Sequence, residues 1–250
     1  MKSCRFVSSF SIIVLTLLSA RVSPQPLPAP VKFLSTVPYD SGDIGDPLGV
    51  DKRCGTQTTL SSSGSPSLIT DDVTFTAQAI ANDVCRRGEQ ITCDDGGVAF
   101  YDGTTLIGNI ALKNCLAVFD TASLTVGRHL ITARFNPPSG WHRSYARVSQ
   151  IVEKQHTSTT LTSSPNPSLH AQEVVFTATV LSPLGVASGK VRFSVAGNPI
   201  TIVPVDSDGI ATLAKKNLPV GTNAITAEYL GDPDNGPSTS APLNQVVNPD

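Results

Sequence analysis

The chain contains the same succession of short motifs twice, and this internal repeat constrains the fold more than any other feature. Residues Thr58–Ser62 return as Thr159–Ser163, and Val73–Ala77 returns as Val174–Ala178 at the same spacing. Three further blocks follow in the same order: Gly97–Phe100 with Gly189–Phe193, Leu124–Phe135 with Leu218–Tyr229, and Ser149–Val152 with Asn244–Val247. Matched blocks in one order indicate that a single structural unit occurs twice.

Each repeated block has the alternation of a β-strand. Val73, Phe75 and Ala77 alternate with threonines, which places the apolar side chains on one face and the polar ones on the other. Gly, Pro, Asn and Asp separate the blocks, and no segment sustains helical periodicity. Each copy therefore offers about seven short strands over roughly a hundred residues, the profile of a Greek-key sandwich. We predict an all-β protein made of two tandem immunoglobulin-like β-sandwiches.

The motifs resemble those of the bacterial Ig-like repeat family. Residues 157–248 carry the pattern nearly throughout, including Tyr229-Leu230-Gly231-Asp232 after the Ile-Thr-Ala strand. Residues 56–153 match more loosely, because Phe135 replaces the tyrosine and Asn136-Pro137-Pro138 replaces the Gly-Asp turn. The resemblance implies sandwiches used for spacing, adhesion or ligand display, and it implies no reaction. We expect domain 1 at 56–153 and domain 2 at 157–248.

The N-terminal segment predicts export. Lys2 and Arg5 precede the apolar run Phe10–Leu18, and Ser19-Ala20 supplies small residues for cleavage, so residues 1–20 read as a signal peptide. An uncleaved anchor is the alternative reading. No later apolar run is long enough to span a bilayer, so we expect a secreted, extracellular protein without a stable membrane anchor. Residues 21–55 are rich in proline and predict an extended arm.

The cysteines agree with an oxidising compartment. Cys4 leaves with the signal peptide, and four cysteines remain, an even number that favours two disulfides. A Cys85–Cys93 bridge would close a short loop and leave Cys54 with Cys115, whereas Cys54–Cys85 with Cys93–Cys115 stays open as the alternative. A zinc site would lack the paired Cys-x-x-Cys spacing and a nearby histidine.

Domain 1 carries two distinctive loops. Asn82–Asp95 is an insertion relative to the second copy, and Asn136–Tyr145 joins its last two strands. In an immunoglobulin-like sandwich these connections lie at one end, together with the cysteines. We predict a braced tip beside an exposed tryptophan, since Trp and Arg often dominate interface energetics. The candidate ligand-binding residues are Arg86, Arg87, Trp141, His142, Arg143 and Tyr145. The alternative is that the loops are only pinned by disulfides.

The chain carries no recognisable catalytic or cofactor motif. No Gly-x-Ser-x-Gly, His-Glu-x-x-His or phosphate-binding Gly-Lys motif is present, so we expect no enzyme and no cofactor. His129 is expected to be a solvated strand residue, and the Asp232–Gly236 turn lacks the spacing of a calcium loop. The formal net charge of -2 argues against nucleic acid and other polyanions as partners.

Two functions are compatible with these features. The first is a binding or adhesion module that recognises an extracellular protein or glycan through the distal loops of domain 1. The second is a structural spacer or matrix protein without a specific ligand site. The few available aromatic side chains, Tyr101, Trp141 and Tyr145, are the residues with which a glycan-binding face would have to be built.

Overall fold

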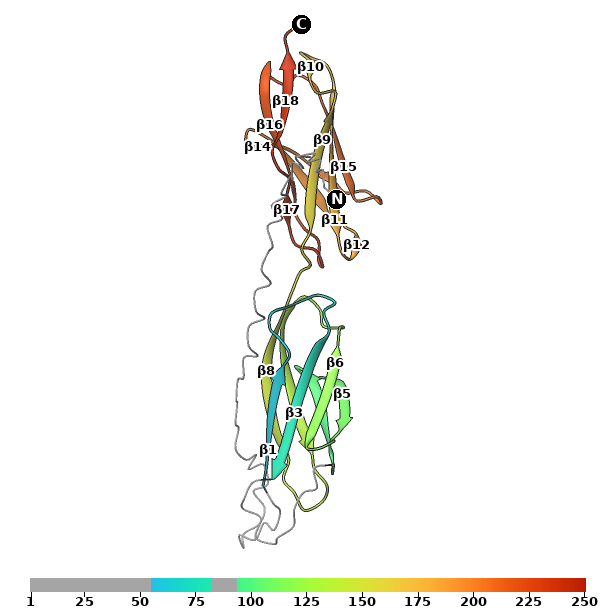
Figure 1. The fold of residues 1–250 in the computed structure, drawn as a ribbon, viewed down its shortest axis with the longest axis vertical. Helices are drawn as coiled ribbons and strands as arrows, with labels where there is room; N and C mark the ends of the chain where they lie inside the picture. Colours follow the sequence, from blue (N-terminus) through green and yellow to red (C-terminus); the bar gives the residue numbers. More distant parts are fainter. Residues whose placement is uncertain (1–54, 82–93) are drawn as a thin grey trace, which may run out of the picture.

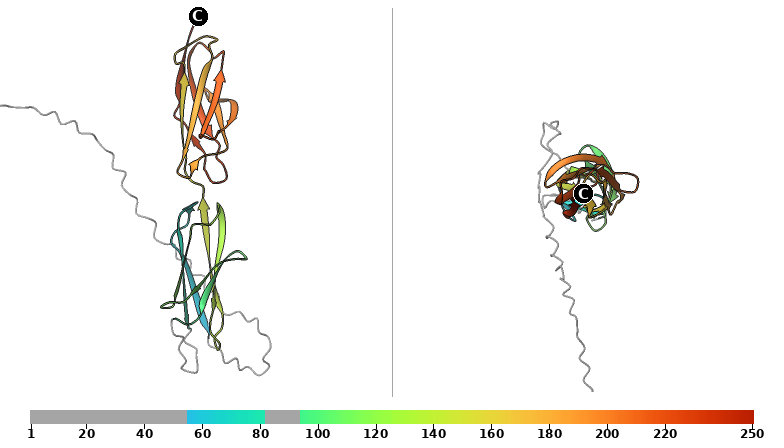
Figure 2. Two further views of the ribbon diagram at one scale, coloured as in Figure 1. Left: turned by 90° about the vertical axis from the view of Figure 1, so that its right-hand side faces the viewer. Right: turned by 90° about the horizontal axis from the view of Figure 1, so that it is seen from above.

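Two β-sandwiches lie end to end along the long axis of the molecule (Figures 1 and 2). The computed structural model describes residues 55–81 and 94–250, and the signal peptide, the proline-rich arm and most of the Asn82–Asp95 insertion lie outside this part of the chain. All regular structure within the described residues is β-strand. The prediction of an all-β protein with two tandem immunoglobulin-like sandwiches is therefore confirmed.

The first sandwich is built from the first eight strands. One sheet has the order β1-β3-β6, and the other has the order β2-β8-β7-β4-β5. The strands are β1 (Thr56–Ser62), β2 (Ser67–Leu68), β3 (Val73–Ala81), β4 (Gly97–Asp102), β5 (Thr105–Ala111), β6 (Leu116–Thr121), β7 (Gly127–Asn136) and β8 (Ser144–Glu153). Because β1 and β2 follow each other in sequence but join different sheets, the chain crosses from one sheet to the other within a few residues.

The second sandwich repeats this plan. Strands β9, β11, β12 and β15 form one sheet, while the other has the order β10-β18-β16-β13-β14 with β17 paired to β16. The bounds are β9 (Ser158–Ser164), β10 (Ser168–Leu169), β11 (Val174–Ser182), β12 (Gly185–Val186), β13 (Lys190–Val195), β14 (Asn198–Pro204), β15 (Ile210–Lys215), β16 (Gly221–Tyr229), β17 (Ser238–Thr239) and β18 (Leu243–Asn248). The repeated sequence blocks thus occupy equivalent strands.

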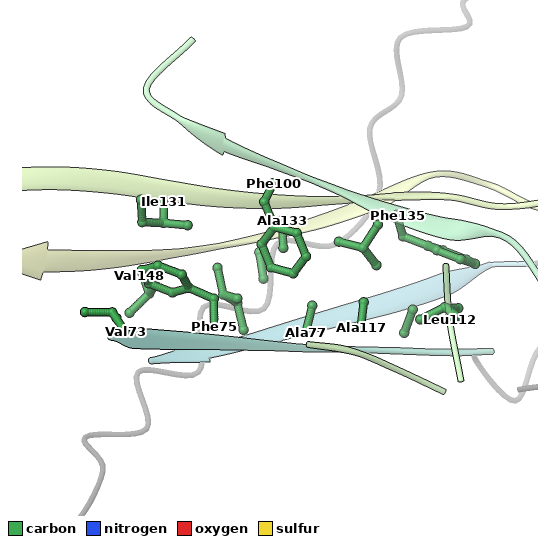
Figure 3. Packing of buried hydrophobic residues seen from close by; sticks show 14 of the residues in the cluster. Val73, Phe75, Ala77, Phe100, Leu112, Ala117, Ile131, Ala133, Phe135 and Val148 are labelled. Atoms are coloured by element: carbon green, nitrogen blue, oxygen red, sulfur yellow. The ribbon is translucent and has the colours of Figure 1, made fainter. Parts of the chain in front are cut away.

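Apolar side chains from both sheets fill the space inside each sandwich. In the first, Phe75 of β3 faces Phe100 of β4 and Phe135 of β7, and all three are fully buried (Figure 3). In the second, Phe176, Phe193 and Tyr229 are equally inaccessible. Burying one such side chain stabilises the fold by roughly 1.5–3 kcal/mol, so the alternation of apolar residues is what closes each pair of sheets.

A buried glutamine holds each sheet-to-sheet crossing. The carboxamide of Gln150 on β8 accepts a hydrogen bond from Ser62 Oγ at 2.7 Å, at the end of β1, and donates to Ser67 Oγ on β2 at 3.1 Å. Gln245 on β18 does the same with Ser163 and Ser168, at 2.7 and 3.3 Å. Both glutamines are fully buried. The sequence repeat contained these residues, but their role as a polar link between the sheets was not anticipated.

The joint between the sandwiches is tied to a turn of the second one. The backbone N–H of Gln155 donates to the Asp234 carbonyl at 2.9 Å, and the N–H of Gly236 donates to the Gln155 carbonyl at 2.8 Å. The Lys154 ammonium adds a hydrogen bond to the Asp232 carbonyl. These bonds hold the linker against the second sandwich.

Replacing Gln150 by leucine is expected to lower the free energy of unfolding of the first sandwich by about 1–3 kcal/mol, because the buried Ser62 hydroxyl would lose its carboxamide acceptor and Ser67 its carboxamide donor. The sole tryptophan of the chain, Trp141, belongs to this sandwich, so its fluorescence during urea unfolding reports on it. Gln78→Leu, at an exposed position of β3, serves as the control and should change stability by no more than about 0.5 kcal/mol. Equal effects of the two substitutions would contradict the proposed role of Gln150.

Tyr229→Phe is expected to leave the second sandwich as stable as before, or slightly more stable. Among the described residues the buried Tyr229 hydroxyl finds no hydrogen-bond partner of good geometry, while burial and the nearby Asp232 carboxylate raise its pKa. Phe135 occupies the equivalent position of the first sandwich. Removing an unpaired buried hydroxyl therefore removes a desolvation cost rather than a bond. Scanning calorimetry measures this, and a clear loss of stability would show that the hydroxyl has a stabilising partner.

Candidate functional site

A groove of about 390 Å³ lies on the outer face of the β4-β7-β8 sheet, next to the start of β8 and therefore away from the linker that follows the end of β8. We call it the tyrosine–arginine groove. Its lining includes the side chains Tyr101, Arg134, Asn136, Arg143, Tyr145 and Arg147. A site of this volume accommodates a small ligand or one residue of a larger one.

Strand register brings these side chains together. Tyr145 of β8 lies opposite Arg134 of β7, and Arg147 lies opposite Thr132, which itself pairs with Tyr101 of β4. Successive residues of a strand point to opposite faces, so the burial of Phe135 and Ala146 inside the sandwich directs Arg134, Tyr145 and Arg147 outward. The groove is therefore a consequence of how the core is packed.

Two tyrosine rings support two guanidinium groups. The guanidinium carbon of Arg134 lies 4.6 Å from the centroid of the Tyr101 ring, and that of Arg147 lies 5.0 Å from the Tyr145 ring. At these distances the cation is attracted to the face of the ring, by about 0.5–1 kcal/mol at an exposed site. The stacking limits the motion of the arginine side chains, whose N–H groups stay available at the edge of each guanidinium plane.

The groove carries an excess of positive charge. Three arginines line it, no acidic side chain does, and all three are exposed. Within the described residues, none of them forms an ion pair with a carboxylate. The second sandwich differs, because Glu228 stands where Arg134 stands in the first and forms an ion pair with Arg192 at 2.9 Å. At this position the first copy therefore presents an unpaired arginine and the second an ion pair.

Hydroxyl groups of β1 support the start of β8. Thr56 Oγ1 lies 2.8 Å from Ser144 Oγ and 2.7 Å from the carbonyl oxygen of His142, and Thr58 Oγ1 lies 2.7 Å from Ser144 Oγ. These contacts connect the first sheet to the loop that ends at the groove. They fix the chain next to Arg143 and Tyr145.

The structure separates the residues that the sequence grouped at the tip. Arg143 and Tyr145 lie in the groove, and His142 is partly buried beside it. The expectation of an exposed tryptophan is wrong, because Trp141 is only 8% exposed. Its large apolar ring is therefore almost inaccessible to solvent and offers little surface to a ligand. The burial of a loop side chain could not be predicted from the sequence pattern, because it depends on contacts with residues that become neighbours only in the folded protein.

The remaining predicted tip residues are described only in part. Arg86, Arg87, Cys54, Cys85 and Cys93 lie outside the described residues. Cys115 lies in the turn between β5 and β6, where its carbonyl accepts a hydrogen bond from the N–H of Ala79 at 3.0 Å. This turn is at the same end of the sandwich as the groove, and the pairing of Cys115 with another cysteine stays a prediction.

Sequence reasoning did not assign Arg134 and Arg147 to the site. Both occupy outward positions of alternating strands, which is the ordinary place for a solvated charge. The signal that could have found them is the substitution between the copies, since Arg134 corresponds to Glu228 in otherwise matched strands. Tyr101 was recognised as an available aromatic side chain, but the arginine above it was not.

His129 departs from its expected role as a solvated residue. It is only 8% exposed, with Nδ1 2.7 Å from Asp102 Oδ2 and Nε2 2.7 Å from the Thr125 carbonyl oxygen. Burial opposes the charged imidazolium, but the hydrogen bonds to Thr125 and Asp102 outweigh burial and raise the pKa of His129 above its ordinary value. Both neighbours are acceptors, so the doubly protonated ring satisfies both. The pair lies at the end of β4 and the start of β7, away from the groove.

The Asp232–Gly236 turn uses its carboxylate within the protein. Asp232 Oδ2 accepts hydrogen bonds from the N–H and hydroxyl of Ser188 at 3.0 and 2.9 Å, and Oδ1 accepts from the N–H of Asn235 at 2.7 Å. Burial alone would raise the pKa of Asp232, but these hydrogen bonds outweigh it and lower the pKa below its ordinary value. Within residues 55–81 and 94–250, no cluster of three or more His, Cys, Asp or Glu side chains suits a metal ion.

The sheet orders and the buried cores define the class of protein, a pair of immunoglobulin-like β-sandwiches. Residues 161–248, which lie within the second sandwich, match the family described as bacterial Ig-like domain (group 3). No curated protein sequence matches the chain. No helix in the described part of the chain is long and apolar enough to cross a membrane.

Several solved structures of tandem domains are similar to this chain. The fibronectin(III)-like modules of CbhA from Clostridium thermocellum share 18% sequence identity, with a TM-score of 0.34 and coverage of 76% of this chain and 95% of theirs. The titin domains Z1Z2, solved in complex with telethonin, share 12% identity, with a TM-score of 0.38 and coverage of 76% and 97%. Murine CEACAM1b shares 12% identity, with a TM-score of 0.34 and coverage of 76% and 99%.

The stability of the first sandwich is expected to fall as the pH rises from about 6 to about 8. A raised folded-state pKa means that the His129 imidazolium stabilises the folded protein below its ordinary pKa, and this contribution is lost as the pH rises through the raised pKa. Urea unfolding followed by Trp141 fluorescence at both pH values measures the change. His129→Asn, which copies the equivalent Asn223 of the second sandwich, should remove the dependence. The same pH dependence in the variant would show that another group is responsible.

Proposed function

We propose that this chain is an extracellular binding module in which the first sandwich recognises a ligand and the second acts mainly as a spacer. The observation that carries the proposal is the tyrosine–arginine groove, with three exposed arginines and no acidic side chain in its lining. Unpaired like charges repel one another, so such a cluster lowers the stability of the folded protein. Binding of an anionic group would explain why the protein has this cluster despite its cost in stability.

The position of the groove supports recognition of another molecule. It lies towards the end of the first sandwich that is remote from the linker, so the second sandwich does not obstruct the approach of a large partner. Loop ends of sandwiches are where immunoglobulin-like domains commonly place binding residues. The signal-like N-terminus agrees with an extracellular setting for this contact.

A spacer role has its own support in the second sandwich. There Glu228 stands at the position equivalent to Arg134 and pairs with Arg192, so no cluster of unpaired arginines forms, and the linker is hydrogen-bonded to the turn at Asp234–Gly236. A domain without such a cluster and with a held linker suits a spacer. We therefore assign recognition to the first sandwich and spacing to the second.

Arrays of extracellular proteins and glycans test the proposal. The purified, oxidised protein is expected to bind at least one array member, and Arg134→Gln/Arg147→Gln should weaken that binding by roughly tenfold or more, because two charge-assisted contacts are lost. Both arginines are exposed, so the variant should fold, with an unfolding temperature lowered by no more than a few degrees through loss of the two cation–π contacts.

The control variant is Arg128→Gln/Lys190→Gln, which removes two exposed cations away from the groove. It has the same net charge as the test variant and should bind as the parent protein does. Equal weakening by both variants would show that binding depends on general electrostatic attraction and not on the groove. Binding that neither variant affects, or no binding at all, would favour the spacer as the function of the whole chain.

A further inference from the structure

We infer that the ligand of the tyrosine–arginine groove is an acidic sugar residue of a glycan, held through its carboxylate or sulfate group. This inference rests on the proposed function and names the chemical class that the groove would take. It is carried by the arrangement of the guanidinium groups, by the strands on which the groove is built, and by the size of the groove.

The guanidinium groups are arranged to bind an anion from more than one side. Arg143, Tyr145 and Arg147 follow one another at alternate positions of one chain segment, so they point to the same face, and Arg134 stands across from Tyr145 on β7. Three arginine side chains therefore line the same groove as Tyr145. Guanidinium N–H groups match the two oxygens of a carboxylate or sulfate in a bidentate manner.

The stacked tyrosines make two of these cations partly pre-organised. Arg134 and Arg147 already lie over the rings of Tyr101 and Tyr145, at 4.6 and 5.0 Å. Side chains that are held before binding lose less rotamer entropy when the ligand arrives. A ring face covered by a guanidinium is not available for stacking by a neutral sugar, so recognition must come from charge and hydrogen bonds.

The strands beneath the groove favour a glycan over a peptide strand. Strands β7 and β4 are internal, since β7 pairs with β4 and β8, and β4 pairs with β5 and β7. The backbone groups of β4 and β7 are used within the sheet, whereas β8 is paired on its outer side only at Val152 and Glu153. A peptide could therefore add a strand along the β8 edge beside the groove, but not across the groove floor. The groove presents side chains only, which suits a ligand recognised by its projecting anionic and hydroxyl groups.

The size of the groove limits the charged part of the ligand. Its volume of about 390 Å³ accommodates one or two sugar rings rather than a long chain. The formal net charge of -2 argues against tight binding of a long polyanion, which requires many dispersed cations. A local cluster of three arginines on a nearly neutral protein instead fits a single acidic residue within or at the end of a glycan.

Isothermal titration with short oligosaccharides tests the inference. The probes are trigalacturonate, which carries carboxylates, a heparin-derived tetrasaccharide, which carries sulfates as well, and maltotriose, which is neutral. Tetraglutamate supplies similar charge on a peptide. At least one acidic oligosaccharide is expected to bind at least tenfold more tightly than maltotriose and tetraglutamate, and Arg134→Gln or Arg147→Gln should each weaken binding by roughly tenfold. A preference between the first two probes identifies the anionic group.

Arg128→Gln is the matched control. Arg128 is an exposed arginine at an outward position of the same strand β7, outside the groove, and its Nε donates to Ser149 Oγ at 3.0 Å. Its substitution should leave binding of the acidic sugar within about twofold of the parent protein. Equal weakening by Arg128→Gln, or equal or tighter binding of tetraglutamate or maltotriose, would overturn the inference.

The outcomes separate this inference from the proposed function. If an array member binds and needs Arg134 and Arg147, but neither acidic oligosaccharide binds, the binding function stands and the assignment to acidic sugars is wrong. If no array member and no oligosaccharide depends on these arginines, both are wrong.

Discussion

A buried glutamine in each sandwich joins the end of one strand to the opposite sheet, and the outer surface depends on this contact. Gln150 must point inward to meet Ser62 and Ser67. Because side chains of a strand alternate between faces, inward burial of Gln150, Val148 and Ala146 leaves Tyr145 and Arg147 no position but the outer face. A slip of β8 by one residue would bury both the arginine and the tyrosine hydroxyl. The register of β8 that buries its core residues therefore also places the groove residues on the outer face.

The two copies share their inner faces and differ on their outer ones. Fully buried positions are held by Phe75, Phe100 and Phe135 in the first sandwich and by Phe176, Phe193 and Tyr229 in the second. Close packing permits little change there. Residues on the outer face are not restricted in this way. Arg134 of the first copy corresponds to Glu228 of the second, which forms an ion pair with Arg192. The same structural unit therefore carries an unpaired arginine at this position in one copy and an ion pair in the other.

The architecture could be predicted from the sequence because it depends on local pattern. The alternation in Val73–Ala77 and its return in Val174–Ala178 indicate strands, and the order of blocks indicates two sandwiches. The groove could not be predicted in the same way. Tyr101 and Arg147 lie far apart along the chain and come together only through the pairing of β4 and β8 with β7. The burial of Trp141 and the hydrogen bonds of His129 likewise depend on neighbours that become adjacent only after folding.

The central claim is that arginines placed outward by the core register form one site for an acidic sugar. Nuclear magnetic resonance of the arginine side-chain Nε–H groups tests it most directly, because each guanidinium reports on its own contacts. On titration with the acidic oligosaccharide that binds, the signals of Arg134 and Arg147 are expected to shift together along one binding curve, while those of Arg128 and Arg192 stay in place. Shifts spread over all of these arginines, or confined to arginines outside the groove, would contradict the account.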